Sequence, residues 1–132
     1  MSITAKRESK KPIKQIVPIA HLVPGERRLE RESVDEAKRS LESGVGEPPN
    51  VLLIGDNYYV SDGNHRVMAA KELGRDSIEC RVKEHKPKPN VADYDADDCA
   101  EAIKLGLLGF NNIPIGSKEE KVTQYDEDEE LL

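Results

Sequence analysis

One segment of the chain changes its apolar period at a single glycine-containing turn, and this change limits the fold more than any other feature. Tyr58, Tyr59 and Val60 are typical of a β-strand. After a turn at residues 61–64, apolar residues recur at helical spacing up to Leu73. A strand that runs through a short turn into a helix is typical of a mixed α/β domain.

Similar patterns predict the other elements of the domain. The expected elements, in chain order, are a strand from Ile13 to Ile19, a helix from Ser33 to Gly44, a hairpin of residues 51–54 and 58–60, a helix after Asn64 that ends at Gly74, and a strand at residues 78–82. The spacing of Ser33 and Glu36 predicts a capping box, and the turn at residues 55–57 is typical of a hairpin. The sum is a β-α-β-β-α-β unit of the α/β (α+β) class.

The regions outside this unit are polar, and the charge is distributed unevenly along the chain. Basic residues crowd the N-terminus, the Lys-Pro-Lys-Pro stretch at residues 86–89 is typical of a linker, and Asp126 to Glu130 are all acidic. The expected organisation is a flexible basic tail at 1–12, one compact α/β domain at 13–84, a linker at 85–94, a C-terminal helix at 95–109 and a flexible acidic tail at 110–132.

The overall composition argues against several classes of protein. The 132 residues carry a formal net charge of −6, which disfavours nucleic-acid binding through bulk electrostatics. Cys80 and Cys99 lack the spacing of a zinc site or a disulfide framework, so we expect no metal ligands of that kind. The chain has no apolar run of membrane-spanning length and no signal-peptide core. We therefore expect a cytoplasmic protein without a membrane partner.

The turn before the second helix is the candidate site. A helix N-terminus presents unpaired backbone N–H groups and the positive end of the helix dipole, and both favour an anion. Gly63 permits a tight turn, and His65 and Arg66 add side-chain donors in the first helical turn. We predict that Gly63, Asn64, His65 and Arg66 hold the phosphates of a nucleotide.

Two motifs give this site a family resemblance. The Gly63-Asn64-His65-Arg66 turn and the Ala-Ala-Lys-Glu-Leu-Gly run at residues 69–74 resemble the ParB/sulfiredoxin-like domain, and the resemblance extends over residues 14–83. It implies a compact fold with nucleotide bound at the turn: CTP in chromosome-partition members, ATP in sulfiredoxins, ADP in free-serine kinases. The expected cofactor is therefore ADP, ATP or CTP, with Mg²⁺.

Within this family the motifs are closest to the free-serine-kinase branch. Pro24-Gly25-Glu26 resembles the Pro-x-Glu of that branch, in which the Glu acts as a base, and Asp62, Gly63, His65 and Arg66 match its Asp-Gly-x-His-Arg pattern. Asn64 occupies the slot of the sulfiredoxin nucleophilic Cys, which excludes redox repair through that residue. The resemblance implies Glu26 as the catalytic base, and Asp62 is the second candidate carboxylate.

Two functions follow from these observations, and the sequence leaves them open. The first is a phosphotransferase or nucleotide hydrolase that holds phosphates at the Asp62–Arg66 turn and acts on a small hydroxyl-bearing substrate. The second is a non-catalytic ParB-like regulatory module that acts through DNA or a protein partner. Whether the chain is an enzyme depends on a substrate pocket around Glu26, which the sequence does not reveal.

Overall fold

The chain folds around one mixed sheet, and the computed structural model describes residues 11–117. The elements in that range are β1 (Ile13–Pro18), η1 (Ile19–His21), β2 (Leu22–Pro24), β3 (Leu29–Glu30), α2 (Arg31–Glu42), β4 (Asn50–Ile54), β5 (Asn57–Asp62), α3 (Asn64–Glu72), β6 (Ser77–Glu84), α4 (Tyr94–Lys104), η2 (Leu108–Phe110) and β7 (Ile115–Gly116). The tails expected at 1–12 and 110–132 lie mostly outside the described residues, because residues 1–10 and 118–132 are not described. Within residues 11–117 no helix is long and apolar enough to cross a membrane.

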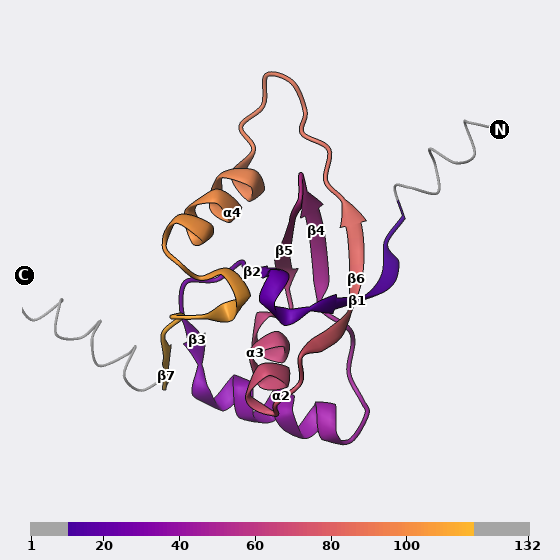
Figure 1. Cartoon of the computed structure of the whole chain (residues 1–132), viewed down its shortest axis with the longest axis vertical. Helices are drawn as coiled ribbons and strands as arrows, with labels where there is room; N and C mark the ends of the chain where they lie inside the picture. The colour runs from indigo at the N-terminus through magenta and orange to yellow at the C-terminus, as the bar shows by residue number, and fades with distance from the viewer. Residues whose placement is uncertain (1–10, 118–132) are drawn as a thin grey trace, which may run out of the picture.

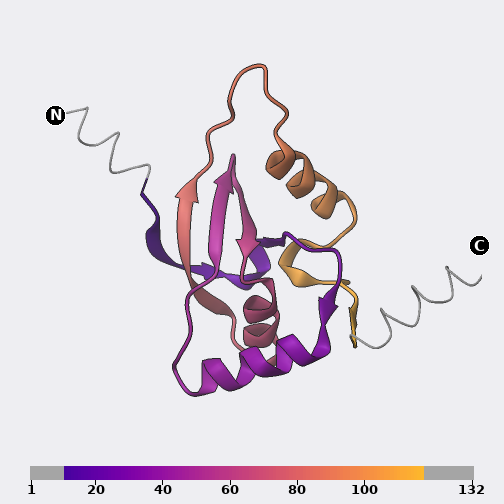
Figure 2. The ribbon, with the colours of Figure 1, turned by 180° about the vertical axis from the view of Figure 1, so that it is seen from behind.

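The main sheet has five strands in the order β1-β6-β4-β5-β2. The β4–β5 hairpin is antiparallel, and Gly55 in its turn has a φ of +60°, so the expected hairpin is present. β6 lies parallel to β4 and antiparallel to β1. The central strands of this sheet run side by side in both views (Figures 1 and 2).

The expected strand at residues 13–19 corresponds to β1, and the segment directly after η1 forms a second, unexpected strand, β2. β1 pairs with β6 at one edge of the sheet, whereas β2 pairs in parallel with β5 at the other edge. The 3-10 helix η1 makes the crossing directly after Pro18, which has no backbone N–H to extend a ladder. The residues of β2, including Pro24, are fully buried, so the crossing carries an apolar segment into the core.

Helices α2 and α3 cover one end of the sheet, and α3 lies between α2 and the strands (Figures 1 and 2). The α2 helix is amphipathic and buries Val34 and Leu41. The α3 helix buries side chains on several faces, and two of them, Ala69 and Ala70, are small enough for close packing. Gly44 and Gly74 follow the two helices with φ values of +71° and +83°, as the sequence predicts.

The start of α2 differs from the expected capping box. The helix begins at Arg31, its N-cap is Glu30, and no side chain caps it. Glu30 is extended because it pairs in β3, and its N–H donates to His65 Nε2 at 3.1 Å. The tertiary contact thus moves the helix start two residues ahead of Ser33, and the capping-box prediction is wrong.

The segment after the linker region also differs from expectation beyond Gly109. The α4 helix is present and Asp93 caps it, its side chain accepting from the Ala96 N–H. Phe110 and Ile113 are buried, and β7 pairs in parallel with β3. Residues 110–117 therefore pack on the body of the protein, because the apolar side chains in this short segment find partners far away in the sequence.

Candidate phosphate-binding site

The site begins where β5 ends and α3 starts. Gly63 separates the two elements with a φ of +93°, a left-handed conformation that favours glycine. A Cβ at this position would lie 2.8 Å from Pro49 Cα, so the turn also approaches the chain before β4 too closely for a side chain. The abrupt strand-to-helix turn that the sequence predicts thus depends on glycine for both conformation and space.

The first turn of α3 leaves backbone donors available. The Gly63 carbonyl accepts from the N–H groups of Arg66 and Val67, both at 3.1 Å. The N–H groups of Asn64 and His65 have no backbone acceptor among residues 11–117. These two donors lie at the positive end of the helix dipole, which is the arrangement that favours an anion.

Asn64 points into the protein rather than toward a ligand. Its side chain is buried, its Oδ1 accepts from the Gly25 N–H at 2.9 Å, and its Nδ2 donates to the Val60 carbonyl at 3.3 Å. Both ends of the amide are therefore used within the fold. Asn64 ties the loop after β2 to the start of α3, and only its backbone N–H remains to meet a phosphate.

His65 points toward the candidate base. Its Nε2 accepts from the Glu30 N–H at 3.1 Å, so the proton of the neutral ring lies on Nδ1. Nδ1 is 3.8 Å from Glu26 Oε2, and the Glu26 side chain is about half exposed. The structure thus brings Glu26 next to the α3 N-terminus, with the imidazole between the carboxylate and the β3 backbone.

Arg66 points away from His65 and toward the segment that joins α2 to β4. A Cβ at Gly46 would lie 2.6 Å from Arg66 Nη1, so the guanidinium lies directly against this glycine. Arg66 lines a cavity of about 520 Å³. The guanidinium of Arg66 has no hydrogen bond or ion pair with the residues that the structure describes.

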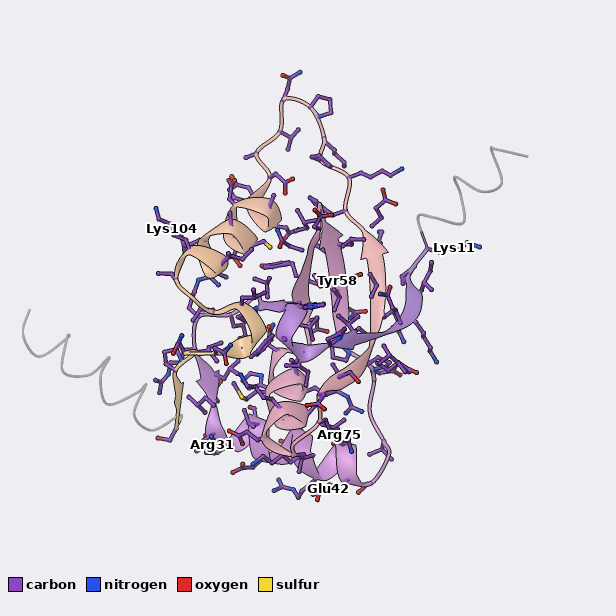
Figure 3. The ribbon with its side chains drawn as sticks, viewed as in Figure 1. Lys11, Arg31, Glu42, Tyr58, Arg75 and Lys104 are labelled. Atoms are coloured by element: carbon purple, nitrogen blue, oxygen red, sulfur yellow. The ribbon has the colours of Figure 1, made fainter. Side chains whose placement is uncertain are left out.

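This cavity has a mixed wall with three cations. The other lining residues are Lys14, Ile16, Leu41, Gly44, Gly46, Glu47, Pro48, Arg75, Ser77, Ile78 and Glu79. Arg75, labelled in Figure 3, follows α3, and Glu47 is already paired with Arg81 at 3.0 Å. The apolar side chains and the cations together suit a ligand with a flat or apolar part and a negative part.

Asp62 is the last residue of β5 and is exposed. Its position next to Gly63 agrees with its place in the motif, but its side chain has no hydrogen bond or ion pair within residues 11–117. Within the same range no group of three or more His, Cys, Asp or Glu side chains could hold a metal ion. The carboxylate that lies close to the turn's own side chains is therefore Glu26.

The residue that anchors the Glu26 loop, Arg27, has no distinctive signal in the sequence. Arg27 Nη2 donates to Asp98 Oδ1 at 2.6 Å and to the Asp98 carbonyl at 2.9 Å, and its Nε donates to Glu101 at 3.2 Å. Tyr59 donates to the other oxygen of Asp98 at 2.6 Å. Burial and this hydrogen bond raise the pKa of Tyr59. Three charged neighbours, at positions 26, 28 and 30, hide this role in the sequence, since nothing local distinguishes Arg27 from them.

Comparison with protein families assigns the chain. Residues 3–95 match the model of the ParB N-terminal domain. The chain belongs to the ParB N-terminal domain family. No curated protein matches it. The family match confirms the ParB/sulfiredoxin-like resemblance that the turn at residues 63–66 indicates, and the mixed α+β fold agrees with it.

Several solved structures are similar to this ParB N-terminal domain protein. One is sulfiredoxin from Arabidopsis thaliana, with 24% identity, a TM-score of 0.47, and coverage of 56% of this chain and 88% of that chain. Another is the C-terminally truncated ParB from Caulobacter crescentus in complex with CTP-gamma-S, at 21% identity, a TM-score of 0.47, and coverage of 74% and 64%. A free serine kinase in complex with AMP has 18% identity and a TM-score of 0.47, over 55% of this chain and 32% of that chain. The chain thus spans about a third of the kinase's length.

Proposed function

We propose that this protein binds the phosphate groups of a nucleotide at the N-terminus of α3. The observation that carries the proposal is the combination at one turn of two backbone N–H groups without backbone acceptors and a guanidinium without a partner, within the described residues. The guanidinium of Arg66 can donate to a phosphate through two parallel N–H groups, which adds a charged contact to the backbone donors. Helix N-termini favour phosphate through their free backbone N–H groups and the helix dipole.

The surrounding residues fit such a ligand. Gly46 and Gly63 leave room where the loop before β4 approaches Arg66 and the turn, and a Cβ at either position would be under 3 Å from its neighbour. The cavity beside Arg66 measures about 520 Å³, which lies within the usual range for small-molecule sites. Mg²⁺ would be held mainly by the phosphates of the nucleotide. Asp62, which directly precedes Gly63, is the carboxylate nearest to the turn along the sequence.

The test is direct binding of CTP, ATP and ADP, each with and without Mg²⁺, measured by calorimetry. We expect at least one nucleotide to bind, and Arg66→Ala to weaken it at least about tenfold. The melting temperature without ligand should change little, because the Arg66 side chain is not part of the core. Arg39→Ala, on the exposed side of α2, is the matched control for loss of one cation.

The two variants separate a phosphate site from general electrostatic attraction. Equal weakening by Arg66→Ala and Arg39→Ala would indicate attraction by the net local charge alone. Unchanged affinity in Arg66→Ala, or no binding of any of the three nucleotides to the wild-type protein, would contradict the proposal.

A second proposal, phosphoryl transfer, is favoured by the place of Glu26. Its carboxylate lies 3.8 Å from His65 Nδ1, and His65 belongs to the first turn of α3. A bound nucleotide would supply the phosphoryl group, and Glu26 would accept the proton of a small hydroxyl-bearing substrate. The Nδ1–H of His65 would orient the carboxylate, since Nε2 is held by the β3 backbone.

Substitution of Glu26 tests this proposal. Glu26→Gln keeps size and removes basicity, so turnover should fall by roughly 10²- to 10⁴-fold while nucleotide affinity changes little. Asp62→Asn is the parallel variant at the other carboxylate. If only Asp62→Asn lowers turnover, the base is Asp62. A wild-type protein that binds nucleotide and transfers no phosphate favours the regulatory module, with a DNA or protein partner.

A cytoplasmic location is also part of this proposal. Cys80 and Cys99 are both free and buried, and burial raises the pKa of Cys80 to about 11. Thiols of this kind are inert and are compatible with a reducing compartment.

A further inference from the structure

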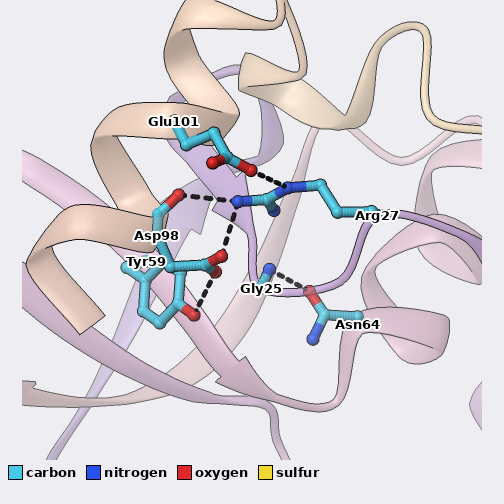
Figure 4. A network of polar contacts seen from close by, with 6 residues as sticks. All are labelled: Gly25, Arg27, Tyr59, Asn64, Asp98 and Glu101. Carbon is cyan, nitrogen blue, oxygen red and sulfur yellow. Dashed lines mark hydrogen bonds and ion pairs between the residues drawn. The ribbon is translucent and has the colours of Figure 1, made fainter. Parts of the chain in front are cut away.

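The loop that carries Glu26 is held on both sides of this residue. Before it, the Gly25 N–H donates to Asn64 Oδ1. After it, the guanidinium of Arg27 bonds to Asp98 and Glu101 of α4 (Figure 4). Glu26 itself makes only the 3.8 Å approach to His65 among the described residues. The backbone on both sides of Glu26 is therefore fixed while its carboxylate stays free to act.

The contact between Arg27 and α4 uses more than one bond. Two donors of the guanidinium meet one side-chain oxygen and the backbone carbonyl of Asp98, and a third meets Glu101. Tyr59 donates to the other carboxylate oxygen of Asp98 and makes no hydrogen bond with the Arg27 guanidinium in this network. Figure 4 shows Arg27 reaching across from its loop to the helix. A planar guanidinium that donates several hydrogen bonds restrains the loop that carries Arg27 more tightly than a single ion pair does.

This contact is poorly explained by stability alone. Nη1 of Arg27 is buried and has no hydrogen-bond partner within residues 11–117. An unsatisfied buried donor costs free energy that offsets part of the gain from the ion pairs. A charge-charge pair at the surface would contribute little in any case. The geometric restraint on the loop is the effect that remains.

The helix that supplies the restraint lies almost entirely outside the segment that matches the family. The match ends at residue 95, and α4 spans Tyr94–Lys104, so Asp98 and Glu101 both follow it. The α4 helix packs beside β2 and β5, the strands that lead into the Glu26 loop and the α3 turn. An element from beyond the matched segment thus contacts the loop that bears the candidate base.

We propose that Arg27 is a positioning residue, which α4 holds through Asp98 and Glu101 so that the Glu26 carboxylate stays beside His65 at the α3 N-terminus. The inference rests on the proposed role of Glu26. It differs from a merely structural role, because loss of the contact should affect Glu26 and not the phosphate-binding turn. The packing of α4 on the domain and the rate of turnover are then linked through the Arg27 side chain.

The test compares Arg27→Met, Arg27→Lys and Tyr59→Phe in the full chain. Met keeps an unbranched apolar side chain and removes every donor, whereas Lys keeps the charge without the fork. Tyr59→Phe removes one bond to Asp98 and leaves Arg27 intact, so it is the matched control. If Arg27→Met loses the fold by circular dichroism, Glu101→Gln replaces it, since that change weakens only one contact of Arg27.

Two measurements are made on each variant. The first is the ¹⁵N order parameter of the Glu26 amide, without any ligand. We expect a rigid value of roughly 0.85 in the wild-type protein and in Tyr59→Phe, and a value below about 0.6 in Arg27→Met.

The second measurement is turnover and affinity with the nucleotide that binds the wild-type protein. Turnover in Arg27→Met should fall by roughly the same factor as in Glu26→Gln, and its nucleotide affinity should stay within about twofold of wild type. The double variant, which combines Arg27→Met with Glu26→Gln, should lose no more turnover than Glu26→Gln alone. Arg27→Lys should recover part of both effects.

The two measurements separate failure of this inference from failure of the proposed function. An equally rigid Glu26 in wild type and Arg27→Met overturns the positioning role, whatever the activity. Turnover that Arg27→Met leaves unchanged overturns it also. A mobile Glu26 in Arg27→Met, in a protein that shows no turnover, supports the restraint and contradicts the catalytic proposal instead.

Discussion

The amide of Asn64 stabilises the site from inside the protein. It bridges the Gly25 N–H and the Val60 carbonyl in a buried place, so removal of the side chain leaves two backbone groups without a partner. Asn64→Ala should therefore lower the free energy of unfolding by about 2–3 kcal/mol, measured by urea denaturation. Glu36→Ala, on the exposed face of α2, should stay within about 0.5 kcal/mol. Similar small changes in both variants would show that the Asn64 bridge contributes little.

Two neighbouring glycines allow a matched comparison of strain and contact. Gly44 and Gly46 both have positive φ values, and a Cβ at Gly44 meets nothing within 4 Å, whereas one at Gly46 would lie 2.6 Å from Arg66 Nη1. Alanine at either position should cost about 1 kcal/mol or more of stability. Only Gly46→Ala should also displace Arg66, and we expect nucleotide affinity to fall at least about fivefold in that variant alone. Equal affinities in the two variants, measured by calorimetry, would contradict the assigned position of Arg66.

The sequence identifies the residues of the turn but not their directions. Three adjacent side chains diverge: Asn64 points inward, His65 toward Glu30, and Arg66 toward Gly46. This divergence follows from the left-handed conformation of Gly63 and from the loops that pack around the helix start, and both depend on the tertiary structure. Glu26 could be named from its motif, whereas the restraint by α4 requires a contact between residues that are far apart in the chain.

At the scale of elements, a charged contact holds α2 against α3. Arg31 of α2 meets Glu72 of α3 with two parallel bonds of 2.8 and 2.9 Å, and Lys38 approaches the same carboxylate at 2.6 Å. Hydrogen bonding to Arg31 is the main cause that lowers the pKa of Glu72 from 4.5 to about 2. Arg31 and the C-terminal residue of α2, Glu42, are both labelled in Figure 3.

This contact should make stability depend on pH in the acid range. Since the pKa of Glu72 is lower in the folded protein than in the unfolded chain, its contribution is complete above about pH 4.5 and is lost as the pH falls toward 2. Solvent screening reduces the contribution to about 1 kcal/mol at neutral pH. Glu72→Gln should therefore lower stability at pH 7 and differ little from wild type near pH 2, by chemical denaturation at each pH. Glu42→Gln is the control, and an equal pH dependence of both variants would contradict the assignment.

The elements with strong local signals could be predicted. The Gly55 hairpin and the helix ends at Gly44 and Gly74 all agree with the structure, because each depends on the conformation of a glycine and its immediate neighbours. The strand β2, which follows the expected strand at residues 13–19, could not be predicted, because it pairs with the distant strand β5 at the opposite edge of the sheet from β1. The early start of α2 has the same cause, since β3 and His65 fix Glu30 in an extended conformation.

For the whole molecule, the structure changes the expected extent of the folded unit. Phe110 and Ile113 are buried, and β7 pairs with β3 directly after the Glu26 loop. A chain that ends after Leu108 should therefore be less stable than one that ends after Ser117, by at least about 3 kcal/mol, because it loses a buried Phe and the β3–β7 pairing. Urea denaturation of the two chains, both starting at Lys11, measures the difference. Equal midpoints would show that these residues are not needed for the fold.

The crossing of residues 13–24 between the two edges of the sheet has a consequence for biosynthesis. Strand β1, which is synthesised before the other strands of the main sheet among residues 11–117, has β6 as its neighbour, and Ile13 pairs with Val82. Until residue 84 has emerged, Val17 of β1, which is fully buried in the folded protein, lacks the strand that pairs with β1. The nascent chain therefore has to keep this segment from self-association during most of its synthesis, and its folding rate should be limited by closure of that long loop.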